Sequence, residues 1–280
     1  MMLTVIGDLI ADVVVLGASR LEIGTDNPAV VTHARGGSAA NVAAAAATRS
    51  MPVRFIGRVG TDTEGDALAQ ALSATGVDVR LQRVGRTGSI VVLVDESAER
   101  TMLTDRGAAA ELEDIDEGWL DGTAWLHLPL YGFLEPTSAA ALMTARDRVG
   151  RAPASLDLSS TAAMRALGTN ALRGILSALS PAVVFANADE ARMLEMLDIF
   201  VDSTTVLVVK RGADAVLVSV DGVAVEVDVD RVADAVDSTG AGDAFAAGYL
   251  VAAMSGVAPV ECAKAGAALA KEALRRPGAI

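Results

Sequence analysis

Aromatic residues and cysteines are scarce in this sequence of 280 residues. Phe, Trp and Tyr together make up 3% of the chain, and Cys262 is its one cysteine. A disulfide framework is therefore excluded, and we interpret Cys262, which lies in an alanine-rich segment, as a buried and unreactive thiol. Because disulfides belong to oxidising compartments, this composition favours a cytoplasmic location. The few aromatic rings also leave little surface on which nucleic-acid bases could stack.

Positive charge and long apolar runs are lacking as well. The chain has 23 Lys and Arg against 36 Asp and Glu, and its formal net charge is −13. Such a surface repels nucleic-acid phosphates, so we expect no nucleic-acid partner. Hydrophobic residues make up 52% of the chain, enough for a substantial core, but they occur in runs too short to cross a bilayer. No basic stretch precedes the first strand-like segment, as it would in a signal peptide, and we expect no membrane partner.

Several common enzyme signatures are absent. No Gly-x-x-x-x-Gly-Lys-Ser/Thr sequence is present, which excludes a P-loop enzyme. No Gly-x-Gly-x-x-Gly follows the first strand, which argues against a nicotinamide-dependent dehydrogenase, and there is no Gly-x-Ser-x-Gly elbow. The two histidines, His33 and His127, lie far apart, so no cluster of His and Cys offers a transition-metal site. Any metal is therefore expected to be a hard ion held by oxygen atoms and phosphate.

The second half of the chain alternates between strand-like and helix-like segments. The predicted strands in this part are 124–128, 154–157, 183–186 and 206–210. Regular alternation of this kind is typical of a parallel sheet with helices on both faces. The sequence therefore predicts an α/β fold that closes with two helices.

Earlier β-like segments do not fit this alternation. We predict that they form a small separate sheet, built from roughly 12–35 and 87–105, within a single α/β domain that spans 1–280. A sheet placed beside the carboxyl ends of parallel strands would make a lid over a ligand crevice. The predicted lid strands are rich in Val, Ile and Leu, so one face could cover a ligand while the other needs a partner. A homodimer through the lid would supply that partner.

The stretch 236–248 joins a glycine-containing turn to a helix of small residues. Gly240 and Gly242 allow backbone amides to converge on an anion, and the helix N-terminus adds unpaired N–H groups and a partial positive charge. Asp243 stands at the same end. Amides that bind negative charge, beside a carboxylate that can accept a proton, suggest phosphoryl transfer to a hydroxyl. The alternative is an ordinary glycine-rich helix start with an Asp near its N-cap.

A second glycine-containing stretch, Arg35-Gly36-Gly37-Ser38-Ala39-Ala40-Asn41, extends the pattern. Together with 237–243 it resembles the two sequence fingerprints of the ribokinase-like (PfkB) carbohydrate kinase family. Between them, 187–190 resembles the family's Asn-x-x-Glu motif, and 210–212 resembles its nucleotide-binding turn. The resemblance covers essentially the whole chain. It implies a ribokinase-like three-layer α/β/α fold with a mostly parallel central sheet and a small β-sheet lid.

The resemblance implies an ATP-dependent phosphotransferase that moves the γ-phosphate to a hydroxyl of a small sugar. Asp243 would be the general base, although its ordinary pKa near 4 makes it a weak one. A weak base suffices if the transition state is loose and the proton leaves late. The amides of Gly240, Ala241 and Gly242 would form the anion hole for the transferring phosphate.

Other positions acquire roles from the same resemblance. Asn187 and Glu190 would organise Mg²⁺, through waters because Mg²⁺ dehydrates reluctantly, although Glu190 could instead be an ordinary exposed helix residue. Asp12, Gly37 and Asn41 match sugar-contacting positions of the family. Asp8 could join them, or could simply cap a turn at the end of a strand.

The nucleotide side is less sharply defined. Lys210 or Arg211 could reach the nucleotide phosphates, or either could be a solvated strand end; Gly212 and Thr239 match cofactor-binding positions. Asp237 and Thr239 could also contribute to a monovalent-cation site. We expect that site to be incomplete, because the ribokinase segment that helps enclose the ion continues beyond the position of Ile280.

The chain departs from the family pattern in ways that leave the substrate open. Ser38 follows the double glycine where relatives often carry another residue, Tyr131 falls near a glutamate position of ribokinase, and Asn and Arg are missing after Asp157. Within the same fold the alternative is a nucleoside kinase of the adenosine or pseudouridine type. An alternative of another class is a non-catalytic protein that senses sugars or nucleotides.

Overall fold

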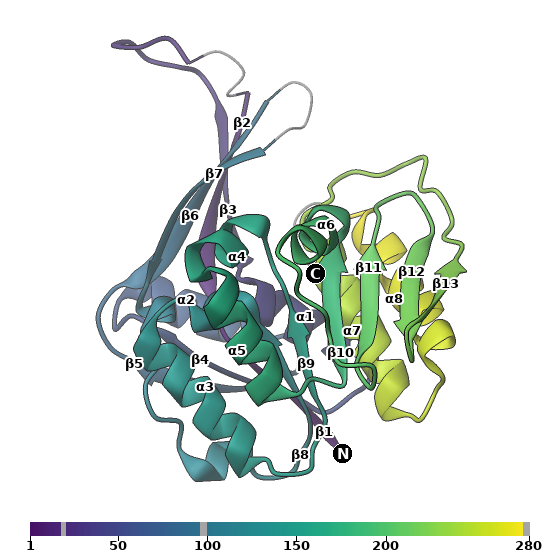
Figure 1. Cartoon of the computed structure of the whole chain (residues 1–280). Helices are drawn as coiled ribbons and strands as arrows, with labels where there is room; N and C mark the ends of the chain where they lie inside the picture. The colour runs from purple at the N-terminus through teal and green to yellow at the C-terminus, as the bar shows by residue number, and fades with distance from the viewer. Residues whose placement is uncertain (18–20, 96–99, 277–280) are drawn as a thin grey trace.

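The computed structural model describes residues 1–17, 21–95 and 100–276, which form one large and one small sheet with helices packed around the large one (Figure 1). The large sheet has nine strands in the order β13-β12-β11-β10-β9-β8-β1-β4-β5. All neighbours from β11 to β5 are parallel. Strand β12 pairs in the antiparallel direction with both β11 and β13. The strands are β1 (Met2–Ile6), β4 (Val53–Val59), β5 (Asp78–Arg83), β8 (Thr123–Pro129), β9 (Ala154–Asp157), β10 (Val183–Asn187), β11 (Val206–Lys210), β12 (Val216–Val220) and β13 (Val223–Val227).

Helices cover both faces of this sheet, which confirms the predicted three-layer α/β/α fold. One face packs against α1 (Ser38–Ala47), α2 (Thr63–Ser73), α7 (Ala241–Met254) and α8 (Pro259–Ala273). The other packs against α3 (Pro136–Arg148), α4 (Thr161–Leu167), α5 (Thr169–Leu179) and α6 (Ala188–Met196). Short 3₁₀ helices lie at Ala108–Ala110, Glu117–Leu120 and Leu130–Phe133.

The strands show why two cores form. Successive side chains of a strand point to opposite faces, so Leu3 and Val5 of β1 enter the core beneath α1 and α7, while Ile6 enters the opposite core. A sheet buried on both faces requires nearly continuous apolar strands, as the sequence has. Cys262 belongs to the first core, where it is 1% exposed and burial raises its pKa to about 11. Among the described helices, none combines the length and hydropathy needed to span a bilayer.

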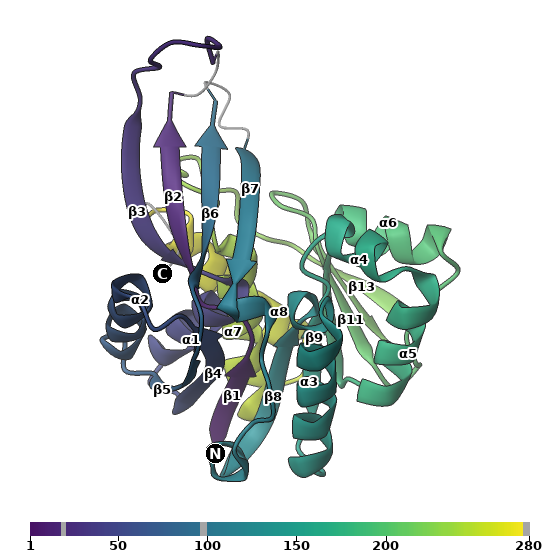
Figure 2. The same cartoon turned by 90° about the vertical axis from the view of Figure 1, so that its left-hand side faces the viewer.

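The small separate sheet expected from the sequence has the order β3-β2-β6-β7, with β2 (Ile10–Leu16), β3 (Val30–Gly36), β6 (Thr87–Val94) and β7 (Arg100–Gly107). The β2–β6 pair is parallel and the other two pairs are antiparallel. Figure 2 shows this sheet standing away from the large one, on the side where the parallel strands end. The sequence also predicts that the strands on either side of 96–99 pair as a hairpin; β6 and β7 do pair, and 96–99 themselves lie outside the described residues.

Helices α7 and α8 approach each other closely because glycine lies at their contact. A Cβ atom on Gly248 would lie 2.7 Å from the carbonyl oxygen of Ala265, and one on Gly266 would lie 2.7 Å from that of Phe245. On its other side α7 packs against the sheet. There the rings of Tyr249 and Phe185 meet edge to face, with 5.3 Å between their centroids. The helix that begins at the glycine turn is thus fixed on two sides.

We expect Gly248→Ala to destabilise the protein by about 1–3 kcal/mol, because the added methyl group overpacks the contact between α7 and α8. Gly174→Ala is the matched control. It lies inside α5, and a Cβ there would meet nothing within 4 Å. It should stabilise by about 0.5–1 kcal/mol through helix propensity. Urea unfolding measures both changes; equal effects would refute the packing argument.

Candidate active site

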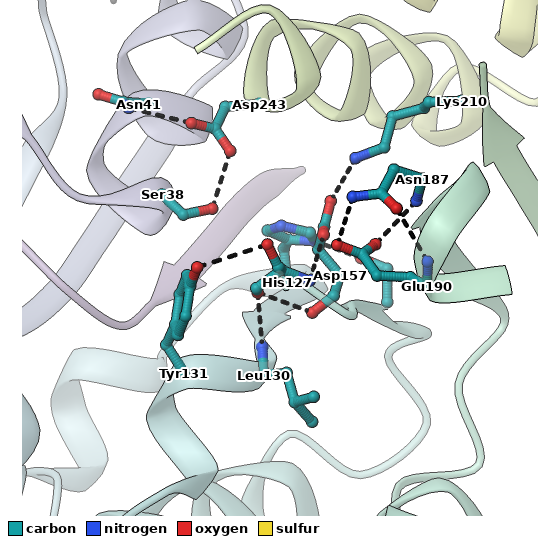
Figure 3. A network of polar contacts seen from close by, with 12 residues as sticks. Ser38, Asn41, His127, Leu130, Tyr131, Asp157, Asn187, Glu190, Lys210 and Asp243 are labelled. Atoms are coloured by element: carbon teal, nitrogen blue, oxygen red, sulfur yellow. Dashed lines mark hydrogen bonds and ion pairs between the residues drawn. The ribbon is translucent and has the colours of Figure 1, made fainter. Parts of the chain in front are cut away.

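Polar side chains gather where the parallel strands end and three helices begin (Figure 3). Asp157 closes β9, Asn187 closes β10 and Lys210 closes β11, while Asp243 lies in the first turn of α7. Ser38 and Asn41 come from the first turn of α1. In open α/β sheets, the crevice outside the carboxyl ends of the strands is where ligands bind. The architecture therefore concentrates donors, acceptors and charge at a ligand-binding position.

The carboxylate of Asp243 is held between two side chains of α1. Ser38 Oγ donates to its Oδ1 at 2.8 Å, and Asn41 Nδ2 donates to its Oδ2 at 3.0 Å. The two glycine-containing stretches, which lie far apart in the sequence, thus meet at this one carboxylate. Ser38, noted in the sequence only as a departure from the family pattern, is one of its two partners.

The environment of Asp243 changes its acidity. Desolvation raises its pKa to about 7; hydrogen bonds from Asn41 and Ser38 and the charge of Lys210 lower it, and the charge of Asp157 raises it. The sequence expectation of a pKa near 4 is therefore replaced by a value near neutrality. A carboxyl group that titrates there accepts a proton readily at physiological pH.

The turn before α7 presents open backbone amides. Gly240, the N-cap residue, is left-handed with φ of 72°, and the amide of Ala241 donates to the carbonyl oxygen of Ser238 at 3.3 Å. The amides of Gly240 and Gly242 have no hydrogen-bond partner within the described part of the chain. Of the three amides predicted to form an anion hole, two are thus open and one is engaged.

The ammonium group of Lys210 lies close to this turn. A Cβ on Gly242 would be 3.4 Å from Lys210 Nζ, and Nζ donates to Asp157 Oδ2 at 2.8 Å. Desolvation lowers the pKa of Lys210, but Asp157, Glu190 and Asp243 together raise it above its ordinary value. Lys210 is therefore a charged, mostly buried group rather than a solvated strand end.

Arg211 and Gly212, the other two residues of that motif, are placed differently. Arg211 Nε donates to the carbonyl oxygen of Ala215, and its Nη2 lies 2.7 Å from Glu226 Oε1, so it is bound to the antiparallel edge of the sheet. Gly212 has φ of 65° in the turn after β11, which explains a glycine there. The structure thus separates the two cations between which the sequence could not choose.

Asn187 and Glu190 form a capping box at the start of α6. Asn187 Oδ1 accepts from the amide of Glu190 at 2.9 Å, and Glu190 Oε2 accepts from the amide of Asn187 at 2.7 Å. Glu190 Oε1 also accepts from Asn187 Nδ2 at 2.7 Å. Glu190 is 1% exposed, so it is not an ordinary surface residue of the helix. Burial, then the charge of Asp157, raises its pKa to about 7.

These groups fit a hard divalent cation held jointly with other oxygen donors. Two buried carboxylates, Asp157 and Glu190, repel each other, and the amide oxygen of Asn187 lies beside them. A divalent cation would stabilise the ionised carboxylates. Among the described residues no three His, Cys, Asp or Glu side chains gather into a metal site. Mg²⁺, which keeps waters and takes phosphate oxygens, fits a donor set of this size.

The predicted sugar-contacting residues lie at the base of the small sheet. Asp8 is 6% exposed, and its Oδ1 accepts from the amide of Ala39 at 3.2 Å. Asp12 Oδ1 is buried and has no partner among the described residues. Burial, then the charge of Asp8, raises the Asp12 pKa to about 6, against the lowering effect of Arg35. Asp12 Oδ1 can therefore accept a hydrogen bond from a ligand.

Glycine allows the chain to fold tightly at this point. A Cβ on Gly37, whose φ is 99°, would lie 2.4 Å from the carbonyl oxygen of Asp8. A Cβ on Gly36 would lie 2.2 Å from Asp12 Oδ1. The double glycine thus brings the start of α1 against the loop that carries Asp8. This is a steric reason for the motif, independent of any ligand.

Two arginines in this region escaped the sequence prediction of site residues. Arg35 Nη1 donates to Asn41 Oδ1 at 3.0 Å, and Arg106 Nη1 donates to Asp8 Oδ2 at 3.1 Å. The Arg106 guanidinium also lies over the Tyr131 ring, 3.8 Å from its centroid. Arg35 stands inside a motif and could have been found there. Arg106 has no local signal beyond a charge at the end of a strand.

Thr239 and Asp237 form a local turn. The Thr239 amide and hydroxyl donate to Asp237 Oδ1 at 2.8 and 2.7 Å. Residues 277–280, on which the expected incompleteness of a monovalent-cation site depended, lie outside the described residues.

Comparisons with known proteins show what this chain is similar to. The sequence model of the family described as pfkB family carbohydrate kinase matches residues 2–280. The ATP-dependent ribose-1-phosphate kinase of Halopiger xanaduensis is 36% identical over 224 residues, which are 77% of this chain and 72% of that protein. Among solved structures, the adenosine kinase from Sinorhizobium meliloti matches with a TM-score of 0.84 at 24% identity, covering 99% of this chain and 94% of that one. An uncharacterized sugar kinase from Pyrococcus horikoshii in complex with ATP matches with a TM-score of 0.83 at 20% identity, covering 100% and 94%. The structural likenesses show the fold.

The raised pKa of Asp243 predicts a pH-dependent effect of Asp243→Asn on stability. An unfolded Asp ionises near pH 4, whereas the folded one ionises near 7, so wild-type stability falls as pH rises through this window. The variant lacks this loss. The melting temperature of the variant minus that of the wild type should therefore increase from about pH 5 to about pH 8. Scanning calorimetry without ligands measures it; a difference that stays constant with pH would contradict the assigned acidity.

Proposed function

Because the chain belongs to the pfkB family of carbohydrate kinases and is therefore a phosphotransferase, we propose that it transfers the γ-phosphate of ATP to a hydroxyl of a small sugar. The observation that carries the proposal is the Asp243 carboxylate. It stands at the N-terminus of α7, beside open amides and an ammonium group, and has a pKa near 7. The base and the anion-binding groups of one phosphoryl transfer are thus adjacent.

In this mechanism Asp243 accepts the proton of the acceptor hydroxyl as its oxygen bonds to phosphorus. The amides of Gly240 and Gly242, with that of Ala241 once its contact to Ser238 loosens, bind the phosphoryl oxygens. Lys210 compensates negative charge on the nucleotide phosphates. Gly212 and Thr239 are proposed to contact the nucleotide.

Asn187 and Glu190 are the residues that would hold Mg²⁺, with Asp157 facing them. When bound, Mg²⁺ would neutralise negative charge on the phosphates. Lys210 and Asp157 already form an ion pair, so Lys210 stays charged whether or not the metal is present.

The small sheet is proposed to act as a lid of a single 1–280 domain. Asp12 lies on β2, while Asp8, Gly37 and Asn41 lie where the lid meets the body, so they would contact the sugar as the lid closes. Closure would exclude water that otherwise accepts the phosphoryl group. We also propose that the enzyme acts in the cytoplasm, since its single cysteine is a buried free thiol.

A nucleoside kinase of the same fold is the second candidate, because one of the matching structures is an adenosine kinase. A nucleobase is usually held by stacking. The described strands of the small sheet carry no Phe, Tyr or Trp, and Arg106 covers one face of the Tyr131 ring. A sugar acceptor is therefore favoured.

A non-catalytic sensor would need no base. Measuring ADP formation against a panel of sugars and nucleosides separates the sugar kinase, the nucleoside kinase and the sensor.

Asp243→Asn is expected to lower kcat by at least about 100- to 10,000-fold, because the general base is lost. Binding of ATP should stay within a few-fold of the wild type, since other groups hold the phosphates. Coupled-assay kinetics and calorimetric titration measure the two quantities. Asp189→Asn, which removes an exposed carboxylate from the start of α6, is the control. A variant that kept more than a tenth of the wild-type kcat would refute the role of Asp243.

We further propose that two copies pair through their lids. Apolar side chains are exposed on both faces of the small sheet, among them Val31 at 53%, Met102 at 54% and Leu103 at 59%. Exposed β-sheet of this kind is normally paired or covered. A two-fold contact in which each lid supports the other would cover it.

Light scattering at micromolar concentration should report a dimer, which Leu103→Glu converts to monomer by placing a charge in the contact. Val223→Glu is the matched control, because Val223 is 66% exposed on the edge strand β13 of the large sheet. A wild-type monomer, or dissociation by both variants, would overturn the pairing of lids.

A further inference from the structure

Arg106 presents an unused pair of donors at the base of the small sheet. Its Nη1 donates to Asp8 Oδ2 at 3.1 Å, and its guanidinium stacks on Tyr131 with 3.8 Å to the ring centroid. Its Nε and Nη2 have no partner among the described residues. These two N–H groups lie on one edge of the guanidinium and point in parallel, which matches the two oxygens of a carboxylate or phosphate. The existing contacts thus fix the group and leave its bidentate edge open.

Arg106 differs from a surface ion pair. Its side chain is 19% exposed and that of Asp8 is 6% exposed. Arg86 and Asp105, a neighbouring pair at the same end of the sheet, are 62% and 59% exposed. Removing a guanidinium from water costs free energy, which a merely structural contact on the surface would not require. The stacking on Tyr131 also restricts the guanidinium before any ligand binds.

A second guanidinium and an unsatisfied acceptor lie nearby. Arg35, from β3, donates to Asn41 and interacts electrostatically with Asp243 and Asp12. Asp12 Oδ1 is buried without a partner among the described residues. An uncharged polyol would use the acceptor but would leave the Arg106 edge unpaired. A ligand with both hydroxyls and an anionic group would use both.

We infer that the acceptor sugar carries an anionic group, a phosphate or a carboxylate, which binds the Nε–Nη2 edge of Arg106. This inference rests on the proposed function, because it names the substrate class of the same site. Figure 3 shows Tyr131, on which Arg106 stacks, on the opposite side of Ser38 from Asp243. The anionic group would therefore bind at Arg106, while Asp243 acts on a hydroxyl of the same sugar.

The chemistry is otherwise that of the proposed transfer. The bond between the γ-phosphorus and its bridging oxygen to ADP breaks, a bond forms from the sugar oxygen to phosphorus, and the hydroxyl proton passes to Asp243. The product is a sugar that carries two anionic groups. Arg106 takes no part in bond making and acts on the binding and orientation of the acceptor.

The test compares neutral sugars with their anionic counterparts on the full chain. The pairs are ribose with its 1- and 5-phosphates, fructose with its 1- and 6-phosphates, and glucose with gluconate. We expect kcat/KM for at least one anionic member to exceed that of its neutral parent by about 100-fold, a difference that two charge-assisted hydrogen bonds can supply. The phosphate and gluconate arms identify which anion the site takes. Calorimetric titration with each sugar gives binding independently of turnover.

Arg106→Gln should raise KM and Kd for that anionic sugar by about 10- to 100-fold, because both charged donors are lost. Affinity for ATP should stay within about two-fold, and the preference over the neutral parent should collapse. Arg106→Lys, which keeps the charge without the fork, should fall in between and also serves if the Gln variant folds poorly. Arg86→Gln removes the same charge from the exposed pair and should change neither constant.

The outcomes separate this inference from the proposed function. If the neutral parents turn over as well as every anionic counterpart, the inference is wrong and the kinase proposal stands. If anionic sugars bind in an Arg106-dependent manner without ADP formation, the inference is supported and the proposed activity is refuted. Equal losses of neutral and anionic sugars in Arg106→Gln would show a merely structural arginine and would overturn the inference.

Discussion

The arrangement of the site depends on the contact between α1 and α7 at the carboxylate of Asp243. Ser38 and Asn41 bind one oxygen each, at 2.8 and 3.0 Å, so the two helix N-termini cannot separate without leaving a desolvated carboxylate unpaired. Glycine makes the approach possible on both sides. Gly37 lets α1 begin against the backbone of Asp8, and Gly248 lets α7 pack against the backbone of α8. The position of one carboxylate is therefore fixed by close packing of backbone at two distant places.

Burial then determines the chemistry of the charged groups. Asp243 and Glu190 have pKa values near 7, with desolvation as the largest cause in both. In both groups burial disfavours the ionised carboxylate. A cation or a proton that binds to the carboxylate therefore lowers its free energy. Lys210 remains charged because Asp157, Glu190 and Asp243 outweigh its own desolvation. Carboxylates and one ammonium thus form a cluster whose ionisation responds to any phosphate or metal that enters.

Sequence alone was informative where function depends on local backbone. The two glycine-containing stretches, the alternation of strands and helices, and the position of Asp243 can be read from neighbouring residues. Acidity could not be read in this way, because the pKa of Asp243 reflects desolvation by elements from the whole chain. Nor could the choice between Lys210 and Arg211. Adjacent residues at the end of a strand point in opposite directions, and only the packing around β11 decides which one faces the site. The position of Arg106 in the site could not be predicted from its neighbours in the sequence, because its partners, Asp8 and Tyr131, are remote in sequence.

The groups proposed for phosphoryl transfer and those proposed for binding the acceptor lie in different parts of the fold. The groups proposed for phosphoryl transfer sit on α7, β9, β10 and β11, whose positions follow from the core and leave little freedom. Asp12, Arg35 and Arg106 belong instead to strands β2, β3 and β7, which leave the body and contact it mainly at their base. Substitutions there can change the charge presented to an acceptor without disturbing the sheet that holds Asp243. The proposed acceptor contacts can therefore change without loss of the proposed base, and the guanidinium of Arg106, held by Asp8 and the Tyr131 ring, is the proposed contact of this kind.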